Sequence, residues 1–327
     1  MTRILGAERR ALLAATLLAA FAAAPAWAQG KYPERPITFI VPFAAGSATD
    51  QLARALGASI TADTKQAVIV DNKAGASGMM AAQAAARAPA DGYTVLISTN
   101  TTHAANEHLY KKLPYDPVKD FVPVTGLGKG GQVLVVRADA PYKSVADLLA
   151  KAKKEPGKLS FGSGSSSSRV AGEMFKQLSG TDILHVPYKS NPNALTDLLG
   201  GQIDMMITDT ATGVPQIKGG KLKALGVSTT KRIALLPEVP TIDEAGVKGY
   251  DMGYWFAAYV PANTPAPVVA RLNELLHAGL KTAAVKAFFD TSGGEPFATT
   301  PEQLAKFQGE ETAKWGRVIK KAGIEAE

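Results

Sequence analysis

Residues 37–50 read ITFIVPFAAGSATD, an apolar β-branched run followed by a turn of small residues and the beginning of a helix. The run at 37–42 predicts a buried strand, and Leu52, Leu56 and Ile60 would share one face of the helix that begins at Ala48. The alternation continues with a strand at 67–70, a helix at 79–87 and a strand at 93–98. This βαβαβ order is typical of a parallel sheet.

A second alternation lies further along the chain. It comprises strands at 159–162, 183–187, 203–208 and 222–227, with helices at 169–178 and 193–199. The sequence therefore predicts an α/β fold with two units. Two long apolar stretches with glycines, 121–136 and 250–260, are expected to be crossover strands that join the units and let them hinge. Helices at 265–280 and 301–321 close the chain and should pack on the first unit, since no third strand series receives them.

The first 28 residues have the three-part order of a secretory signal peptide. Arg3, Arg9 and Arg10 precede an apolar run at 11–24, and Ala26-Trp27-Ala28 matches a small-x-small cleavage site. The apolar run is shorter than the ~20 residues that span a bilayer, so we favour cleavage after Ala28 over a membrane anchor. The sequence thus predicts a periplasmic protein.

Composition and net charge limit the classes of partner that the sequence predicts. Removal of residues 1–28 takes away three Arg and one Glu and lowers the formal net charge from +7 to +5. The remaining sequence contains no long basic run, so nucleic acid is not an expected partner. A mildly positive field suits an anionic ligand, although an ordinary soluble surface explains it equally well. Cysteine is absent, which excludes a disulfide framework, and a chain of this length can fold without one.

Two strand-to-helix turns, one in each unit, carry the predicted chemistry. In open parallel sheets, ligands bind beyond the carboxyl ends of the strands, where helix amino ends present free N–H groups. Both turns combine small residues with hydroxyls that can donate to a carboxylate, and we expect them to act as opposing jaws. The candidate ligand-binding residues are Phe43, Ala44, Gly46, Ser47, Ala48, Thr49 and Asp50 in the first turn, and Ser163, Ser165, Ser167, Ser168 and Arg169 in the second.

Some of these residues have structural alternatives. Ser47 and Asp50 have the spacing of a capping box. This structural role is the favoured one for Asp50, because a free carboxylate would repel an anionic ligand. The backbone N–H groups of residues 46–49 would then bind the ligand. The serine run at 165–168 has the composition of a flexible linker, but it lies between a strand and a helix. For Arg169 the sequence leaves two roles equally open, a surface role and bidentate contact with a second ligand carboxylate.

Ordered motifs across the whole region after residue 28 resemble one family. They are YPERP at 32–36, VPF at 41–43 with Asp50, NKAGASG at 72–78, DGYT at 91–94, LPYDP at 113–117, VPYK at 186–189, LLGGQID at 198–204, LGVST at 225–229 and PANTP at 261–265. The chain is similar to the Bug family, the extracytoplasmic solute receptors of tripartite tricarboxylate transporters. Where the family usually has a Pro-Gly-Gly-type sequence, this chain has Ala45-Gly46-Ser47.

The resemblance implies a two-domain Venus-flytrap fold of the type II periplasmic binding proteins. Its domains would comprise 29–129 with 254–327, and 130–253, and a small carboxylate would bind in the cleft between them. It adds pocket residues that follow later strands: Thr99, Asn100 and His103, then Tyr188, Lys189 and Ser190, and finally Asp209 and Thr210. Lys189 is expected on the surface. The partners would be the carboxylate and separately encoded membrane subunits, and we expect a monomer without cofactors.

The sequence gives little support for an enzyme active site. The match to G-x-G-x-x-G at 126–131 precedes a strand-like run instead of a helix, which argues against a dinucleotide site. The four histidines include no H-E-x-x-H motif, so no metal site is indicated. A secreted serine-type hydrolase that uses the serines at 163–168 remains the alternative to a receptor without catalysis.

Overall fold

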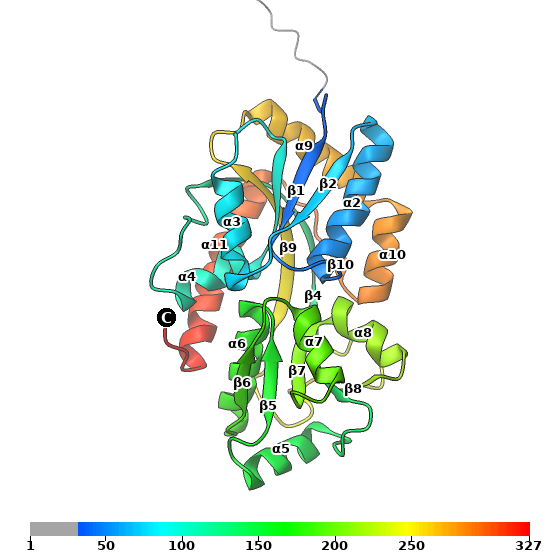
Figure 1. The fold of residues 1–327 in the computed structure, drawn as a ribbon, viewed down its shortest axis with the longest axis vertical. Coiled ribbons are helices and arrows are strands. Elements are labelled where there is room, and N and C mark those ends of the chain that lie inside the picture. Colours follow the sequence, from blue (N-terminus) through cyan, green and yellow to red (C-terminus); the bar gives the residue numbers. More distant parts are fainter. Residues whose placement is uncertain (1–31) are drawn as a thin grey trace, which may run out of the picture. The chain divides into compact units, whose positions relative to one another are not determined.

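The computed structural model describes residues 32–327, so the predicted signal peptide lies outside the described residues, and residues 35–327 form one compact unit. The first part of the chain alternates strands and helices (Figure 1). Its elements are β1 (Ile37–Val41), α2 (Ala48–Thr64), β2 (Val68–Asn72), η1 (Ala76–Gly78), α3 (Met79–Ala86), β3 (Thr94–Thr99), the π-helix η2 (Thr101–Ala105) and α4 (Asn106–Leu109). Strand β1 pairs in parallel with both β2 and β3, so the predicted βαβαβ unit is confirmed.

The long strand β4 (Phe121–Arg137) leads into the second alternation. There the elements are α5 (Val145–Lys154), β5 (Ser160–Ser163), α6 (Ser166–Ser179), β6 (Leu184–Pro187), α7 (Asn191–Leu199), β7 (Met205–Asp209), α8 (Thr210–Lys218) and β8 (Leu222–Val227). Strand β5 pairs in parallel with β6 and β7, as predicted, while β7 and β8 run antiparallel to β4. Helices α5 and α8 were not predicted.

The chain then returns to the first strands. It ends with β9 (Gly253–Pro261), α9 (Ala266–Leu280), α10 (Ala283–Ser292), β10 (Glu295–Pro296) and α11 (Pro301–Lys321). Thr300 and Gln303 form the capping box that opens α11. The predicted packing on the first unit holds for α9, which contacts α2 and β4, whereas α11 also contacts α6 of the second unit.

The strands described in residues 32–327 follow the order β2-β1-β3-β9-β4-β7-β5-β6, with β8 and β10 also paired to β4. We call β2, β1, β3, β9, β10 and residues 121–131 of β4 the first half-sheet, and residues 132–137 of β4 with β7, β8, β5 and β6 the second half-sheet. Only β4 pairs in both. Residues 250–260 join the two parts of the chain, as expected. Tyr250 and Met252 form hydrogen bonds with Ala171 and Ser228 of the second part, whereas β9 pairs only with β3 and β4 in the first half-sheet.

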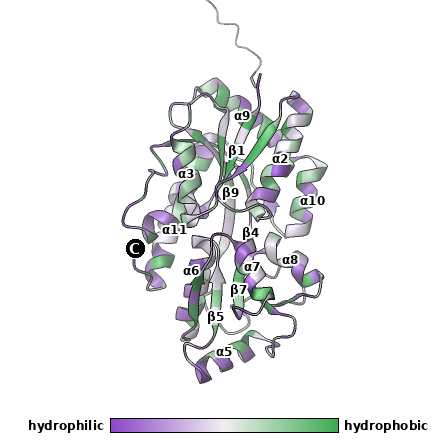
Figure 2. Cartoon of the chain, in the orientation of Figure 1, coloured by the Kyte–Doolittle hydropathy of each residue, from purple (hydrophilic) through white to green (hydrophobic). Residues whose placement is uncertain are grey.

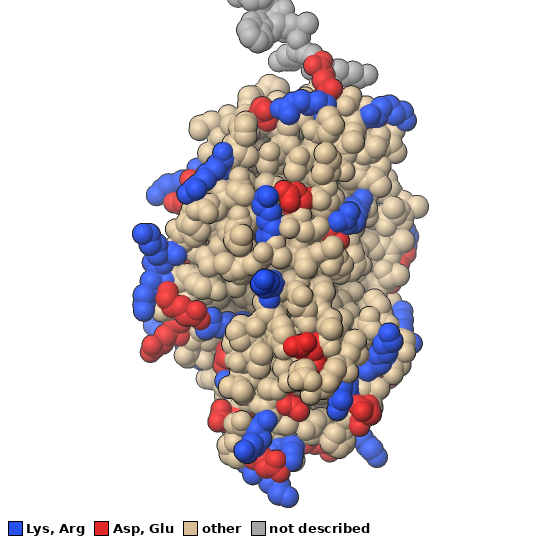
Figure 3. Space-filling model, in the orientation of Figure 1, with Lys and Arg blue, Asp and Glu red and all other residues tan. Residues whose placement is uncertain are grey.

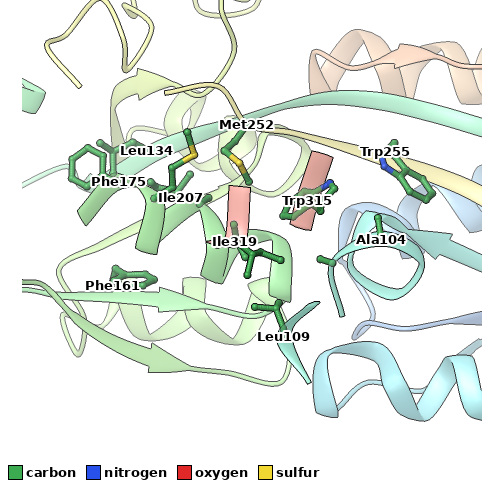
Figure 4. Close-up of a cluster of buried hydrophobic side chains, with 14 of the residues drawn as sticks. Ala104, Leu109, Leu134, Phe161, Phe175, Ile207, Met252, Trp255, Trp315 and Ile319 are labelled. Atoms are coloured by element: carbon green, nitrogen blue, oxygen red, sulfur yellow. The ribbon is translucent and has the colours of Figure 1, made fainter. Parts of the chain in front are cut away.

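Apolar packing joins the two half-sheets on one side. Figure 4 shows Trp315 and Ile319 of α11 between Phe161, Phe175 and Ile207 of the second half and Ala104, Leu109 and Trp255 of the first. The helices carry both hydrophobic and hydrophilic residues (Figure 2), as expected for helices with one face against a sheet. None of the helices in residues 32–327 is both long and apolar enough to span a bilayer.

Candidate functional site

A cavity lies where the ends of the strands meet the beginnings of several helices. It encloses about 410 Å³ when open solvent is included. Its walls comprise Phe43, Ser47, Ala48, Thr49, Thr99, Asn100, Thr101, Gln132, Ser165, Ser167, Asn191, Asp209, Tyr254 and Phe256. These residues come from the amino ends of α2, η2, α6, α7 and α8 and from β3, β4 and β9, so both half-sheets contribute.

The beginning of α2 holds two backbone donors toward the cavity. The Ser47 hydroxyl caps the helix by accepting from the N–H of Asp50 at 3.3 Å. The N–H of Gly46 donates to the Asp50 carboxylate, and the N–H of Ser47 donates to the carbonyl of Ala44. For the N–H groups of Ala48 and Thr49, the described residues provide no acceptor. These two donors remain for a ligand, together with the positive end of the helix dipole.

Asp50 has a structural role instead of a ligand contact. Its carboxylate accepts hydrogen bonds from Gly46 N–H, from Asn72 Nδ2 at 3.0 Å and from Arg54 Nε at 3.0 Å. Burial raises the pKa of Asp50, but the hydrogen bonds from these groups outweigh it and hold the pKa below its ordinary value. The predicted capping box is therefore modified, because the carboxylate returns to the N–H of Gly46 and not to that of the cap Ser47.

Hydroxyl groups add further donors to the walls. The hydroxyl oxygens of Ser47, Thr99 and Thr101 each accept a backbone N–H, from Asp50, Thr101 and Ser167 respectively. Ser167 Oγ accepts from Asn100 Nδ2 at 3.0 Å and from Gln132 Nε2 at 3.1 Å. None of the four has an acceptor for its own proton within residues 32–327, so each is set to donate into the cavity. The walls are thus rich in donors.

The serine run forms the beginning of α6 and is not a flexible linker. Ser165 and Ser168 make a reciprocal capping box, and Ser166, Ser167 and Ser168 are buried. The run also contacts the first half-sheet's elements, since Ser166 Oγ donates to Asn106 Oδ1 at 2.7 Å and Ser167 N–H donates to Thr101 Oγ1. Its donors are therefore mostly satisfied within the protein.

Comparison with known proteins gives the family. The model of the tripartite tricarboxylate transporter family receptor, TctC, matches residues 52–324. This chain belongs to that family. The periplasmic binding protein BugD has a structure that superposes with a TM-score of 0.87 at 35% identity, covering 90% of this chain and 100% of BugD.

Two other solved structures contain carboxylates. The R. palustris protein Rpa4515, solved with adipate, superposes with a TM-score of 0.87 at 36% identity over 90% of this chain and 100% of its own. MatC from Rhodopseudomonas palustris, with bound malate, has a TM-score of 0.82 at 32% identity over 88% of this chain and 100% of its own. The receptor therefore has the α/β periplasmic-binding-protein fold. Its family consists of solute-binding proteins and not of enzymes, which sets the hydrolase alternative aside.

The walls of the receptor's cavity contain no Lys, Arg or His among the residues that the structure describes there. Their one carboxylate, Asp209, caps α8 by accepting from Thr212 N–H at 2.8 Å and also accepts from Asn191 Nδ2 at 2.9 Å. Charged side chains of both signs are scattered over the face shown in Figure 3. An anion in this cavity would have to rely on N–H and O–H donors.

The structure brings nine of the predicted site residues into the cavity wall. They are Phe43, Ser47, Ala48, Thr49, Thr99, Asn100, Ser165, Ser167 and Asp209. Eleven others do not line it: Ala44, Gly46, Asp50, His103, Ser163, Ser168, Arg169, Tyr188, Lys189, Ser190 and Thr210. The last of these lies nearby, because Thr210 Oγ1 is 3.3 Å from the hydroxyl of Tyr254.

Two of those eleven are engaged elsewhere. The Arg169 guanidinium forms an ion pair with the side chain of Glu327, which favours a structural role over contact with a second ligand carboxylate. The hydroxyl of Tyr188 donates to Asp197 at 2.8 Å, and burial together with that carboxylate raises the pKa of Tyr188 to about 12. In both residues a partner within the protein already occupies the polar group, and neither residue lines the cavity.

Sequence reasoning missed five wall residues, namely Thr101, Gln132, Asn191, Tyr254 and Phe256. Asn191 follows Ser190 at the beginning of α7 and could have been found by the strand-to-helix rule. Gln132, Tyr254 and Phe256 lie inside long strands, where no local signal separates a wall residue from a core residue. Trp255 is buried, and its indole N–H donates to Glu311, in keeping with a packing role.

His103 is a packing residue too. It is fully buried, with its ring stacked on Tyr259 at 4.0 Å between centroids, and burial lowers its pKa to about 3. No cluster of three or more potential metal ligands occurs within residues 32–327.

Proposed function

We propose that this receptor captures a small carboxylate in the cavity and delivers it to the membrane subunits of a tripartite transporter. The observation that carries the proposal is the set of free donors: the N–H groups of Ala48 and Thr49 and four hydroxyl protons converge on a cavity without a basic side chain. Charge-assisted hydrogen bonds to such donors stabilise a carboxylate without a counter-ion. The adipate and malate in the related structures support the same ligand class.

Calorimetric titration with adipate, malate and aromatic monocarboxylates tests the ligand class. The control is adipamide, which keeps the shape of adipate and removes both charges. We expect saturable binding of at least one carboxylate and a large loss of affinity for the diamide, because neutral groups gain less from the helix dipole. Equal affinity for acid and amide, or no binding of any carboxylate, would contradict the proposal.

The proposal includes a motion of two domains, 29–129 with 254–327 and 130–253. Gly130, Gly131 and Gly253 support a hinge at this boundary, since glycine lets strands bend where side chains would resist. A ligand that contacts both domains would favour the closed state. Small-angle scattering should therefore show a smaller radius of gyration at saturating ligand, and an unchanged radius would count against the motion.

Residues 1–28 are proposed as a signal peptide cleaved after Ala28, so that a monomeric receptor acts in the periplasm without nucleic-acid partners. The periplasmic-binding-protein relatives support this location. Intact mass of protein purified from the periplasmic fraction, together with light scattering, tests both points. A mass that retains residues 1–28, or a dimer mass, would contradict the respective statement.

A further inference from the structure

Two hydrogen-bond acceptors lie side by side in the cavity wall, where β4 pairs with β7. Gln132 and Asp209 are directly opposite each other in this antiparallel ladder. The side chains of such a pair project from the same face of the sheet, with their Cβ atoms about 4.5–5.5 Å apart. Both residues line the cavity. We call Gln132 and Asp209 the acceptor pair.

Gln132 has an acceptor that the protein leaves unused. The residue is 2% exposed, and its Nε2 donates to Ser167 Oγ at 3.1 Å. Its Oε1 is buried and has no hydrogen-bond partner within residues 32–327. The main chain holds the residue in place, because its N–H donates to Ser228 Oγ at 2.7 Å and its carbonyl accepts from the N–H of Ser228 at 2.9 Å. Buried acceptors are normally paired, so a ligand group that donates to Oε1 would supply the missing contact.

Asp209 adds a negative charge beside this acceptor. Its carboxylate accepts from two neutral donors, Asn191 Nδ2 at 2.9 Å and Thr212 N–H at 2.8 Å. Asn191 is itself fixed, since its Oδ1 accepts from Gly164 N–H at 3.0 Å and from Ser168 Oγ at 3.1 Å. The described residues of the cavity wall include no basic side chain that could balance the charge of Asp209. This carboxylate therefore attracts a cationic group and repels a second anionic one.

We infer that the acceptor pair binds an ammonium group of the ligand, so that the receptor prefers amino carboxylates to simple acids. The inference rests on the proposed function, because the carboxylate of the same ligand would bind the free N–H groups of Ala48 and Thr49. An ammonium group has three protons to donate and carries the positive charge that the wall lacks, whereas a hydroxyl group has one proton and no charge. A zwitterion thus matches both the donors and the acceptors of this cavity.

Calorimetric titration of matched acids tests the ligand class. Each set contains a parent acid, its hydroxy acid and its amino acid: propionate, lactate and alanine; succinate, malate and aspartate; butyrate, γ-hydroxybutyrate and γ-aminobutyrate. The readout is the amine ratio, the affinity for the amino acid divided by that for its parent. In at least one set we expect an amine ratio of about tenfold or more, as a hydrogen bond to a charged group provides, and a smaller gain for the hydroxy acid.

Two substitutions of Gln132 separate its acceptor from its structural role. Gln132→Leu and Gln132→Glu both remove the Nε2 donor to Ser167, but only the glutamate keeps an acceptor and adds a charge. The amine ratio should fall by about tenfold in Gln132→Leu and stay equal or rise in Gln132→Glu, because only the first loses the contact with the ammonium group. Asp209→Asn should also lower the ratio. Asp182→Asn, which removes an exposed carboxylate away from the cavity, should leave it unchanged.

The outcomes separate this inference from the proposed function. Wild type that binds a parent or hydroxy acid as tightly as the amino acid in every set would overturn the ammonium site while leaving carboxylate binding intact. The same holds if folded Gln132→Leu and Gln132→Glu change the amine ratio alike, which would make Gln132 a structural residue. If wild type binds none of these acids or the other carboxylates tested, the proposed function itself fails, and the inference with it.

Discussion

The turn before α2 and the turn before α6 both begin a helix with a serine cap, yet their donors have different partners. Around α2, Asp50 and the Ala44 carbonyl take the N–H groups of Gly46 and Ser47, and those of Ala48 and Thr49 remain for a ligand. Around α6, serine hydroxyls, Asn191 and Thr101 take most of the donors. Similar sequences thus leave two backbone donors without an acceptor in the α2 turn, within residues 32–327, and form a structural junction in the α6 turn.

A proline at the first position of α2 is the strongest test of this difference between the two turns. Ala48→Pro removes one free N–H while keeping the helix, since proline suits this position and Ser47 already has the extended conformation, ψ 158°, that precedes proline. Loss of a hydrogen bond to a charged group costs about 1.5–3 kcal/mol, so the affinity for a carboxylate should fall by about 10- to 150-fold. Calorimetry measures the loss.

Ser166→Pro is the matched control at the first position of α6. Ser165 is also extended, with ψ 159°, and Ser166 does not line the cavity. We expect a much smaller loss of affinity, although the hydrogen bond to Asn106 is lost. Equal losses in the two variants would mean that both turns bind the ligand directly.

Asp50→Asn tests the support of the α2 turn. The side chain is 3% exposed and accepts from Gly46, Arg54 and Asn72, so we expect the free energy of unfolding to fall by about 1–3 kcal/mol. Because the folded-state pKa lies below the ordinary value of 3.8, wild type has this stabilisation above that pH and loses it as the pH falls further. Urea unfolding between neutral and acidic pH should show the two proteins converging at low pH. A constant difference would contradict this role.

These two turns also show how far the sequence could predict the site. The strand-to-helix rule located both turns, because the carboxyl ends of parallel strands lie at one edge of a sheet. It could not tell which donors stay free, since that depends on distant partners such as Asn72 for Asp50 and Asn100 for Ser167. The same limit applies to Tyr254, whose place in the wall follows from the pairing of β9 with β4.

Ser167→Ala tests the junction on the α6 side. Its hydroxyl accepts from Asn100 and Gln132, and both amides lose that acceptor in the variant. A buried donor left without an acceptor costs about 1–3 kcal/mol, and we expect a loss at the lower end because other polar groups lie nearby. Thermal unfolding measures it, with Ser179→Ala at the far end of the same helix as the control. No difference between these variants would show that the junction adds little stability.

Arg169→Gln should have the smallest effect, and it decides between the two roles that the sequence left open. The guanidinium pairs with Glu327, whose side chain is 57% exposed, and such pairs contribute about 0–1 kcal/mol to stability. Since Arg169 does not line the cavity, the affinity for a carboxylate should stay close to wild type at both low and high salt. A loss comparable with that of Ala48→Pro, and reduced by salt, would instead make Arg169 a ligand cation. The free amides of α2 would then no longer suffice to explain how the receptor holds its anion.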